Sequence, residues 1–528
     1  MSVEPRAAEE IILETHDRET AAAAEEKSKL QKHFGRFDML FFLICTLVGL
    51  DTLGVVANAG PEGLTWLLFL AAFFFIPYAL LTSELGSTFT EEGGSYIWTR
   101  LAFGRFVACV NAVLYWLSNP VWMGGLLCIT AVTTWNVFFG DLGEVGKYLF
   151  SFAFIWIGVW AAILSFGIGK WIPTLGAWMR VLLLGFFTFS VILYAFKHGL
   201  NAPKATKFKP SYTLFIALVP VLFFNFVGFE LPSAAGDEMK DPQKDVPFTV
   251  IRSAFASVLL YGVPIAAILF VLPADRITGL SGFIDTMQTV FTVYGGEVTK
   301  TGATLTGAGK VLGDMAALGF ILVLLSSGTT WIMGSDRSLA VAGYDGAGPR
   351  VLGTFSKKFG TPIVVNFLSG MVATIVMILA FQLSGGSADK YFNAVLNVVL
   401  LFTTISYIAI FPALIKLRYS HGHVHRPYRV PFGMKGVWVV GILTTFWAVL
   451  ASAVGLFPGL GDGQLLNDSA LPDGFSRGTF ELVCFVPLVI TLLVGVLFYV
   501  MGARTRAQLA DAPPPFIPPE IAIDPGSA

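Results

Sequence analysis

The chain has 528 residues, of which 55% are hydrophobic and 13% are charged, and its formal net charge is −1. This composition argues against a set of soluble domains, because several stretches reach the roughly 20 mainly apolar residues that a membrane-spanning helix needs. The small net charge gives no indication of a nucleic-acid partner. The cysteines lie in apolar stretches without a close pair, so no disulfide framework, zinc site or other cofactor site is predicted; they are Cys45, Cys109, Cys128 and Cys484.

Residues 1–37 are polar and rich in Ala and Glu, and they predict a cytoplasmic tail without a cleavable signal peptide. Residues 504–528 predict a second cytoplasmic tail, rich in Pro. Between the tails, apolar stretches predict twelve membrane-spanning segments, at approximately 38–58, 64–89, 105–139, 147–167, 173–197, 212–236, 248–272, 311–335, 362–383, 391–418, 436–457 and 480–503.

An even number of spans places both termini on one side of the membrane. Lys and Arg are concentrated in the tails and loops of that side, and such loops usually face the cytoplasm. The sequence therefore predicts a multi-pass protein of the cell membrane, embedded in the lipid bilayer, with both termini cytoplasmic.

Two predicted spans are interrupted at corresponding positions. The first contains Gly49–Gly54, and the sixth contains Phe226–Glu230 followed by Pro232. Gly weakens a helix and Pro lacks the amide N–H, so both segments are expected to break. Paired interruptions of this kind are typical of transporters built from inverted repeats with a site near the middle of the membrane. The predicted division is a transmembrane domain at 38–503, with repeats at about 38–197 and 212–418 and extra helices at about 436–503.

Two carboxylates mark these breaks, Asp51 in the first and Glu230 in the second. A carboxylate is costly at membrane depth, which makes each a candidate functional group. Their charge favours a substrate with an ammonium group, or a proton, and Glu230 is the preferred proton carrier. The alternatives are a salt bridge or helix cap for Asp51, and a proline kink with Glu230 bonded to a neighbouring helix.

Other polar and aromatic residues within the spans allow two interpretations each. Arg180 stays charged when buried and could replace a coupling cation, or it could reach the cytoplasmic interface. Asn119, before Pro120, could bind a polar substrate group or join two helices. Phe224 and Trp331 could flank a cationic substrate or pack within the protein. Because no nucleophile–base pair, phosphate loop or zinc motif occurs, the sequence does not predict an enzyme.

Four sets of motifs, in order along the chain, resemble those of the amino acid–polyamine–organocation (APC) superfamily of transporters. They are Glu84–Ser87 with Gly93–Trp98, Phe226–Glu230 with Asp237–Pro247, Asp336–Ala340 with Asp345-Gly346 and Gly360–Pro362, and Arg426–Gly433. The resemblance covers roughly the first ten spans. It implies an all-α integral membrane protein of the LeuT type, with twelve transmembrane helices arranged as a 5+5 inverted repeat plus two C-terminal helices. Substrate would bind between the first, third, sixth and eighth spans.

The resemblance also implies roles for individual residues. By similarity to the arginine/agmatine exchangers, Asn119, Phe224, Glu230 and Trp331 fall at positions tied to substrate contact, gating or protonation. Arg180 falls near a Lys position that replaces sodium in proton-coupled relatives, which implies transport without sodium. The expected substrate-binding residues are Gly49, Asp51, Thr52, Asn119, Phe224, Asn225, Gly228, Glu230 and Trp331, and the expected coupling residues are Glu230 and Arg180.

The chain departs from this family pattern in the first span, where Gly49-Leu50-Asp51 replaces the usual Gly-Ser-Gly. A carboxylate there would repel a substrate carboxylate, which raises polyamines and other organic amines as substrates unless Asp51 is protonated or points away. The predicted function is secondary active transport of an amino acid or related organic amine, sodium-independent and either proton-coupled or exchanging. An amine-specific transporter or exchanger and a membrane solute sensor are the alternatives. Both a monomer and a homodimer are compatible with the sequence.

Overall fold

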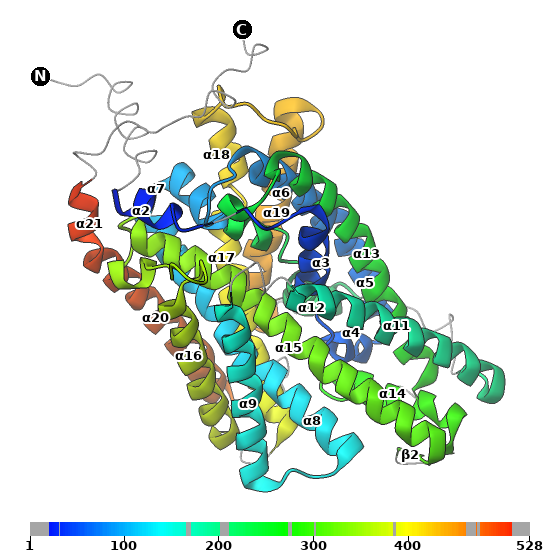
Figure 1. The fold of residues 1–528 in the computed structure, drawn as a ribbon. Helices are drawn as coiled ribbons and strands as arrows, with labels where there is room; N and C mark the ends of the chain where they lie inside the picture. The colour runs from blue at the N-terminus through cyan, green and yellow to red at the C-terminus, as the bar shows by residue number, and fades with distance from the viewer. Residues whose placement is uncertain are drawn as a thin grey trace, which may run out of the picture.

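A computed structural model describes residues 21–30, 32–164, 171–200, 211–272, 277–299, 302–383, 387–460, 471 and 476–508. The described residues form an elongated bundle of helices, with one short β-hairpin near one end (Figure 1). This confirms the prediction of an all-α membrane protein.

Ten helices among the described residues are long and apolar enough to cross a membrane. Each overlaps one of the twelve predicted spans, and some consist of consecutive pieces. They are α5 (Pro61–Leu70), η1 (Ala71–Phe75) and α6 (Ile76–Thr88) together; α7 (Ser95–Trp122), η2 (Met123–Leu127) and α8 (Cys128–Phe139) together; α9 (Gly143–Ile163); α11 (Trp171–His198); α13 (Pro242–Val271); α15 (Gly307–Tyr344); α16 (Ile363–Leu383); α17 (Ala388–Ile410) with α18 (Ala413–Ser420); α19 (Gly433–Leu456); and α20 (Arg477–Met501).

The other two predicted spans consist of shorter helices separated by irregular backbone. The first contains α3 (Arg36–Leu47) and α4 (Leu53–Asn58), with residues 48–52 between them. The second contains α12 (Tyr212–Phe224) and the 3₁₀ helix η4 (Leu231–Glu238), with residues 225–230 between them. Gly228 adopts a φ of +126°, which a residue with a side chain rarely adopts. These two irregular segments are called the paired breaks below.

The remaining elements are short. They are α2 (Ala21–Lys27), α14 (Gly282–Phe291), η6 (Thr292–Tyr294), η7 (Arg350–Gly353), α21 (Ala503–Ala507) and the antiparallel strands β1 (Gly296–Val298) and β2 (Ala303–Leu305), in which Gly296 pairs with Leu305. The sequence interpretation missed α14 and the hairpin, because they lie in a connection without a long apolar pattern. It also began the third span at residue 105, whereas α7 begins at Ser95 and bends at Gly104, where φ is 83°.

The described residues that precede α3 pack against the helices. The buried Glu26 accepts a hydrogen bond from the Phe355 backbone N–H at 2.8 Å, just after η7. Further along, the Phe34 N–H donates to the Glu238 carbonyl at 2.9 Å, and the Lys240 N–H donates to the Phe34 carbonyl at 3.0 Å. The start of α3 is therefore joined through its backbone to the end of η4.

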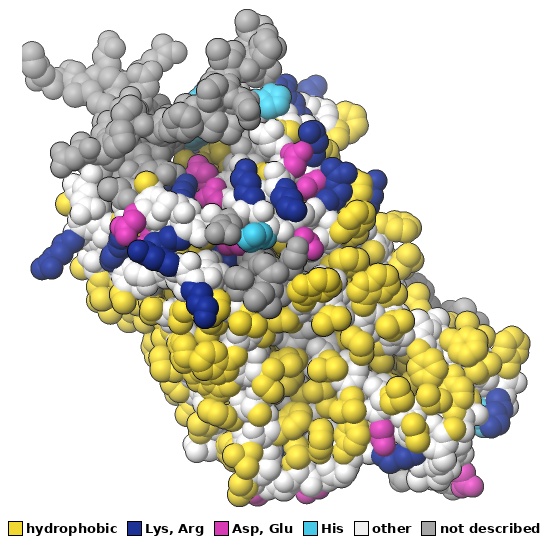
Figure 2. Space-filling view, viewed as in Figure 1, with side chains coloured by type: hydrophobic (Ala, Val, Ile, Leu, Met, Phe, Trp, Pro, Cys, Tyr) yellow, Lys and Arg dark blue, Asp and Glu magenta, His cyan; other side chains and the backbone are white. Residues whose placement is uncertain are grey.

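Side chains on the surface separate into an apolar belt and a charged end. Figure 2 shows hydrophobic side chains over most of the visible face, with most of the visible Lys, Arg, Asp and Glu at the end that carries α2 and α18 and a few at the opposite end. The most apolar stretch of Ser95–Phe139 is 72% buried, against 22% for Arg477–Met501. The α7–α8 helix is therefore central to the bundle, and α20 is peripheral. The end that carries α2 and α18 is called the charged end.

Close helix contacts in the bundle depend on glycine. A Cβ atom at Gly124 in η2 would lie 2.0 Å from the Ala373 carbonyl oxygen of α16, which is well inside contact distance. A Cβ atom at Gly185, within α11, would meet no atom within 4 Å. The two glycines therefore form a matched pair for testing how tightly the bundle is packed.

Gly124→Ala is expected to destabilise the protein by about 1–3 kcal/mol, because the added methyl group forces α16 away from η2. Gly185→Ala should leave stability unchanged or raise it slightly, because Ala favours a helix more than Gly does. Thermal unfolding of the two purified variants in the same detergent provides the measurement. Equal unfolding temperatures would contradict the close packing described for η2 and α16.

Candidate functional site

The paired breaks lie against each other in the interior of the bundle. Thr52 Oγ1, in the first break, donates a hydrogen bond to Asn225 Oδ1, in the second, at 2.5 Å, and both residues are buried. A Cβ atom at Gly228 would lie 2.6 Å from Thr46 Cγ2 and 2.9 Å from Trp331 Cζ2. The second break therefore packs directly on the end of α3 and on α15.

Asp51 is buried in the first break with only 2% of its surface exposed. Its Oδ2 accepts a hydrogen bond from Trp122 Nε1 at 2.8 Å. Its Oδ1 is buried and has no hydrogen-bond partner among the residues that the structure describes. Gly49 makes room for this arrangement, since a Cβ atom there would lie 3.0 Å from Asp51 Oδ1.

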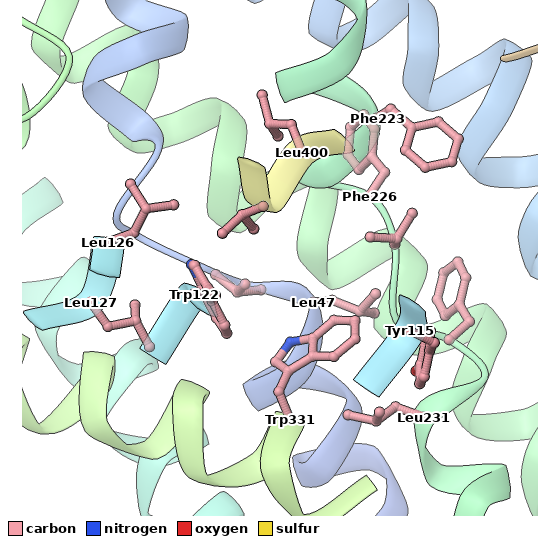
Figure 3. Packing of buried hydrophobic residues seen from close by; sticks show 14 of the residues in the cluster. Leu47, Tyr115, Trp122, Leu126, Leu127, Phe223, Phe226, Leu231, Trp331 and Leu400 are labelled. Carbon is pink, nitrogen blue, oxygen red and sulfur yellow. The ribbon is translucent and has the colours of Figure 1, made fainter. Parts of the chain in front are cut away.

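Aromatic rings surround the same region. The Trp122 ring lies 5.9 Å from the Phe224 ring and 6.3 Å from the Trp331 ring, measured between centroids. Trp331 Nε1 donates to the Thr46 carbonyl at 3.0 Å, near the end of α3. Figure 3 shows Trp122 and Trp331 beside the irregular backbone, with Tyr115 close to Leu231. The Trp122 side chain that donates to Asp51 therefore packs between two further aromatic rings.

Glu230, in the second break, is held by three tyrosine hydroxyl groups. Its Oε1 accepts from the hydroxyls of Tyr115 at 2.7 Å and Tyr407 at 2.6 Å, and its Oε2 accepts from the Tyr78 hydroxyl. Tyr78 also accepts from the Gly228 N–H at 3.1 Å. The structure gives Glu230 no ion-pair partner within its described part, so hydroxyl donors from α6, α7 and α17 stabilise the carboxylate.

Arg180 lies fully buried within α11, which does not agree with the interpretation that it reaches the interface. Its Nε donates to the Val48 carbonyl in the first break at 2.9 Å, and its Nη2 donates to the Val323 carbonyl of α15 at 3.2 Å. The other acceptors are the Gly176 carbonyl, the Ser326 and Ser327 hydroxyls and the Cys45 thiol. A permanent positive charge therefore joins the first break to α11 and α15.

The structure thus brings most of the predicted residues together. Asn119 is an exception in its hydrogen bonding, since its Nδ2 donates to the Tyr115 carbonyl of its own helix at 3.0 Å. Sequence reasoning missed the side chains that hold the two carboxylates, namely Tyr78, Trp122 and Tyr407, together with Tyr115 as a partner of Glu230. No local pattern marks these residues, because they lie on four separate stretches of α6, α7 and α17. No group of three or more His, Cys, Asp or Glu suited to a metal ion occurs within the described ranges.

The sequence motifs lie mainly elsewhere, as buried ion pairs at the charged end. Glu84 accepts from Arg418 Nε at 2.5 Å and from the Val430 N–H at 2.7 Å. Asp345 accepts from Arg100 at 2.9 Å and from Arg105 at 2.9 Å. These contacts join motifs that are far apart in the sequence, and they lie outside the paired breaks.

A family model described as an amino acid permease matches residues 34–467. The chain belongs to the amino acid permease family. Membership confirms the predicted place in the APC superfamily, and it identifies a membrane transporter and not an enzyme.

This permease resembles several proteins at about a quarter sequence identity. It is 26% identical over 426 residues to a probable agmatine/putrescine antiporter, AguD, of Lactococcus lactis, covering 80% of this chain and 88% of the relative. It is 26% identical over 464 residues to an uncharacterized transporter of Legionella pneumophila, covering 85% of this chain and 95% of the relative. It is 25% identical over 435 residues to the polyamine transporter PUT1 of Oryza sativa, covering 79% and 73%.

Among solved structures, the permease resembles a mutant of the Eremococcus coleocola manganese transporter. The TM-score is 0.56 at 10% identity, and the match covers 96% of this chain and 97% of that chain. At this identity the likeness shows a shared transporter fold alone.

Proposed function

We propose that this permease transports organic amines, such as agmatine, diamines or polyamines, by alternating access. The observation that carries the proposal is Asp51, a buried carboxylate at a helix break with one oxygen unpartnered in the described structure. A buried polar atom without a partner is costly, and a substrate ammonium group would supply the missing donors and charge. The same carboxylate would repel the carboxylate of an amino acid.

Two further observations support an amine. Trp122 contacts Asp51 and packs against Phe224 and Trp331, and aromatic faces attract cations. Two of the relatives are named for agmatine, putrescine or polyamines. The proposed substrate-binding residues are Gly49, Asp51, Thr52, Asn119, Phe224, Asn225, Gly228, Glu230 and Trp331.

The proposed architecture has twelve spans, with α3–α4 and α12–η4 as the first and sixth. Repeats at about 38–197 and 212–418 would place these two broken spans at equivalent positions, which supports a substrate site between them. The extra helices would occupy about 436–503. The distribution of Lys and Arg supports a cell-membrane protein with residues 1–37 and 504–528 in the cytoplasm.

Glu230 is the proposed proton-coupling group. Its carboxylate accepts from hydroxyl groups on α6, α7 and α17, so it joins helices from different parts of the bundle. A proton on Glu230 would turn one accepting oxygen into a donor, and at least one tyrosine would have to change its hydrogen bond. Binding a proton would therefore alter the contacts between these helices, which is what coupling to alternating access requires.

Arg180 is the second proposed coupling residue. Its guanidinium donates to the Val48 and Val323 carbonyls, which are groups that a bound metal cation could otherwise coordinate. Because an Arg side chain keeps its proton in proteins, this charge would be permanent. We infer that transport needs no sodium.

The second candidate is an amino acid transporter, which the description of the family model favours. In that case Asp51 would carry a proton when the substrate carboxylate enters the site. Importers and exchangers are both compatible with this geometry, and so are a monomer and a homodimer.

In a thermal-shift panel, agmatine and putrescine are expected to stabilise the purified protein, whereas arginine and ornithine are not. At a hundredfold excess over the dissociation constant, the gain is about 2.7 kcal/mol. Asp51→Asn should abolish the shift, because the neutral amide lacks the charge that attracts an ammonium group. Asp141→Asn, at an exposed position, is the control and should keep the shift. Stabilisation by the amino acids alone would overturn the amine proposal.

Glu230→Gln is expected to make amine transport independent of a proton gradient, because the amide cannot gain or lose a proton. Uptake into proteoliposomes with and without a pH difference measures the effect, and the gradient-driven component should fall to background. Glu297→Gln, on the exposed part of β1, is the control and should behave as the unmodified protein does. A gradient-driven component that survives in Glu230→Gln would place proton coupling elsewhere.

Replacing sodium by potassium should leave the transport rate unchanged. Arg180→Ala should lower stability by about 2–5 kcal/mol, because several buried acceptors lose their donor. Both effects are measurable on one preparation, by uptake in the two buffers and by thermal unfolding. Uptake that requires sodium would refute the proposed role of the guanidinium.

A further inference from the structure

A second group of buried charges lies at the charged end, apart from the paired breaks. Arg337 Nη1, on α15, donates to Glu92 Oε1 at 2.7 Å and lies 2.6 Å from Glu238 Oε1. The three side chains are only 1%, 0% and 5% exposed, respectively. Glu92 lies between α6 and α7, and Glu238 ends η4. One guanidinium nitrogen therefore serves two carboxylates from different parts of the chain.

Both carboxylates of this cluster have a buried oxygen that lacks a hydrogen-bond partner within the described residues, and on Glu238 that oxygen is the one that contacts Arg337. On Glu92 the oxygen without a partner is Oε2. Burial raises the pKa of the Glu92 carboxyl to about 8, because it removes water from the charged form; the Glu238 and Asp237 charges add to the rise and Arg337 opposes it. A proton on either carboxyl group would match one negative charge to one guanidinium.

Among the described residues, the neighbouring cations form ion pairs with other carboxylates. Lys27 contacts Glu91 at 3.1 Å, and Arg100 contacts Asp345 at 2.9 Å and lies 3.9 Å from Glu91. Arg36, on α3, contacts Asp245 at 2.6 Å, while Asp38 accepts from the Gly35 N–H. The pKa of the nearby Asp237 is raised by burial, with Lys27 and Lys32 opposing the rise. Asp336, beside Arg337, accepts from Asn366 and Ser369.

We propose that Glu92 and Glu238 share one proton-binding site at the charged end, separate from Glu230, and that the bound proton holds η4 against α15. With the proton bound, one neutral carboxylic acid and one carboxylate contact the Arg337 guanidinium, so one negative charge faces one positive charge. Without it, two buried like charges repel each other across the contact. The inference concerns regulation of the transporter and does not depend on which amine is carried.

Through Glu238, the proposed proton-binding site is connected along the chain to both paired breaks. The η4 helix follows directly from the second break, and the Phe34 backbone joins its end to the start of α3, which leads to the first break. A loosened contact between η4 and α15 would therefore free both broken segments at the charged end. If that end is cytoplasmic, as proposed, the site responds to cytoplasmic pH.

The direction of the pH effect follows from the raised pKa of Glu92. When η4 and α15 are apart, the Glu92 side chain is exposed to water and its pKa returns toward the ordinary value for Glu. The closed contact therefore binds the proton more tightly than the separated one does. Proton-linked stabilisation of the closed contact is therefore full below the ordinary pKa of Glu, decreases as the pH rises above that value, and is lost above about pH 8.

Accessibility of η4 provides the test. Ala234, in η4, is 2% exposed, and its carbonyl accepts from the Gly93 N–H at 3.0 Å. In full-length protein reconstituted in nanodiscs and carrying Ala234→Cys, the rate of modification by a charged maleimide reports separation of the contact. Two variants are compared in this background: Glu92→Gln, which mimics the protonated carboxyl, and Glu91→Gln, a half-exposed neighbour on the same connection.

Both variants carry the same reporter thiol. The effect of pH on the ionisation of that thiol therefore largely cancels when the two modification rates are divided. We expect the Glu91→Gln rate to exceed the Glu92→Gln rate by a factor that grows with pH, up to about tenfold per pH unit. If Glu92→Gln does not fold, Glu238→Gln replaces it, because it also leaves one carboxylate on Arg337. A ratio that stays constant from about pH 6 to pH 9 would overturn the proposal.

Infrared difference spectroscopy supplies a readout that a merely structural role would not change. The carbonyl band of a protonated carboxyl group should titrate near pH 8 in Glu91→Gln and be absent in Glu92→Gln. The same band in both variants would contradict the site. Neither measurement involves amine binding. A negative result here would therefore not contradict the proposed substrate, and a negative result in the amine panel would not contradict this proton-binding site.

Discussion

Broken helices inside an apolar belt leave backbone groups that lipid cannot satisfy, and the rest of this structure is arranged around that constraint. Side chains from four surrounding helices form hydrogen bonds with backbone groups of the two breaks and of the end of α3. Arg180 donates to the Val48 carbonyl, Trp331 donates to the Thr46 carbonyl, and Tyr261 donates to the Leu47 carbonyl. The Tyr261 hydroxyl also accepts from the Gly49 N–H, and the Tyr78 hydroxyl accepts from the Gly228 N–H. Each bond also fixes a neighbouring helix against a break.

The two carboxylates at the breaks are satisfied to different degrees. Glu230 has hydroxyl donors on both oxygens, whereas Asp51 has a single indole donor and a bare oxygen within the described structure. A satisfied carboxylate suits a group that changes only its proton, and an unsatisfied one suits a group that awaits a cationic partner. The difference in hydrogen bonding supports the different roles that we propose for Asp51 and Glu230.

Local sequence signals predicted features that depend on a few adjacent residues. The breaks follow from Gly49 and Gly228, and the long helices follow from apolar stretches, so both were accessible to sequence reasoning. The Tyr78, Tyr115 and Tyr407 partners of Glu230 were not, because only helix packing brings them together. The same limit applies to the ion pairs of the charged end. Motifs such as Glu84–Ser87 were visible in the sequence, but their partners lie hundreds of residues away.

The backbone pairing of Phe34 with the end of η4 gives the first residues of the structure a mechanical role. Glu26 is held by the Phe355 N–H after η7, so the N-terminal segment bridges two connections before it enters α3. Because Phe34 pairs with the end of η4 and leads into α3, we infer that a shift at one of these two places is passed to the other. We therefore expect truncation of this segment, or binding of a partner to it, to change the transport rate without contact with the substrate.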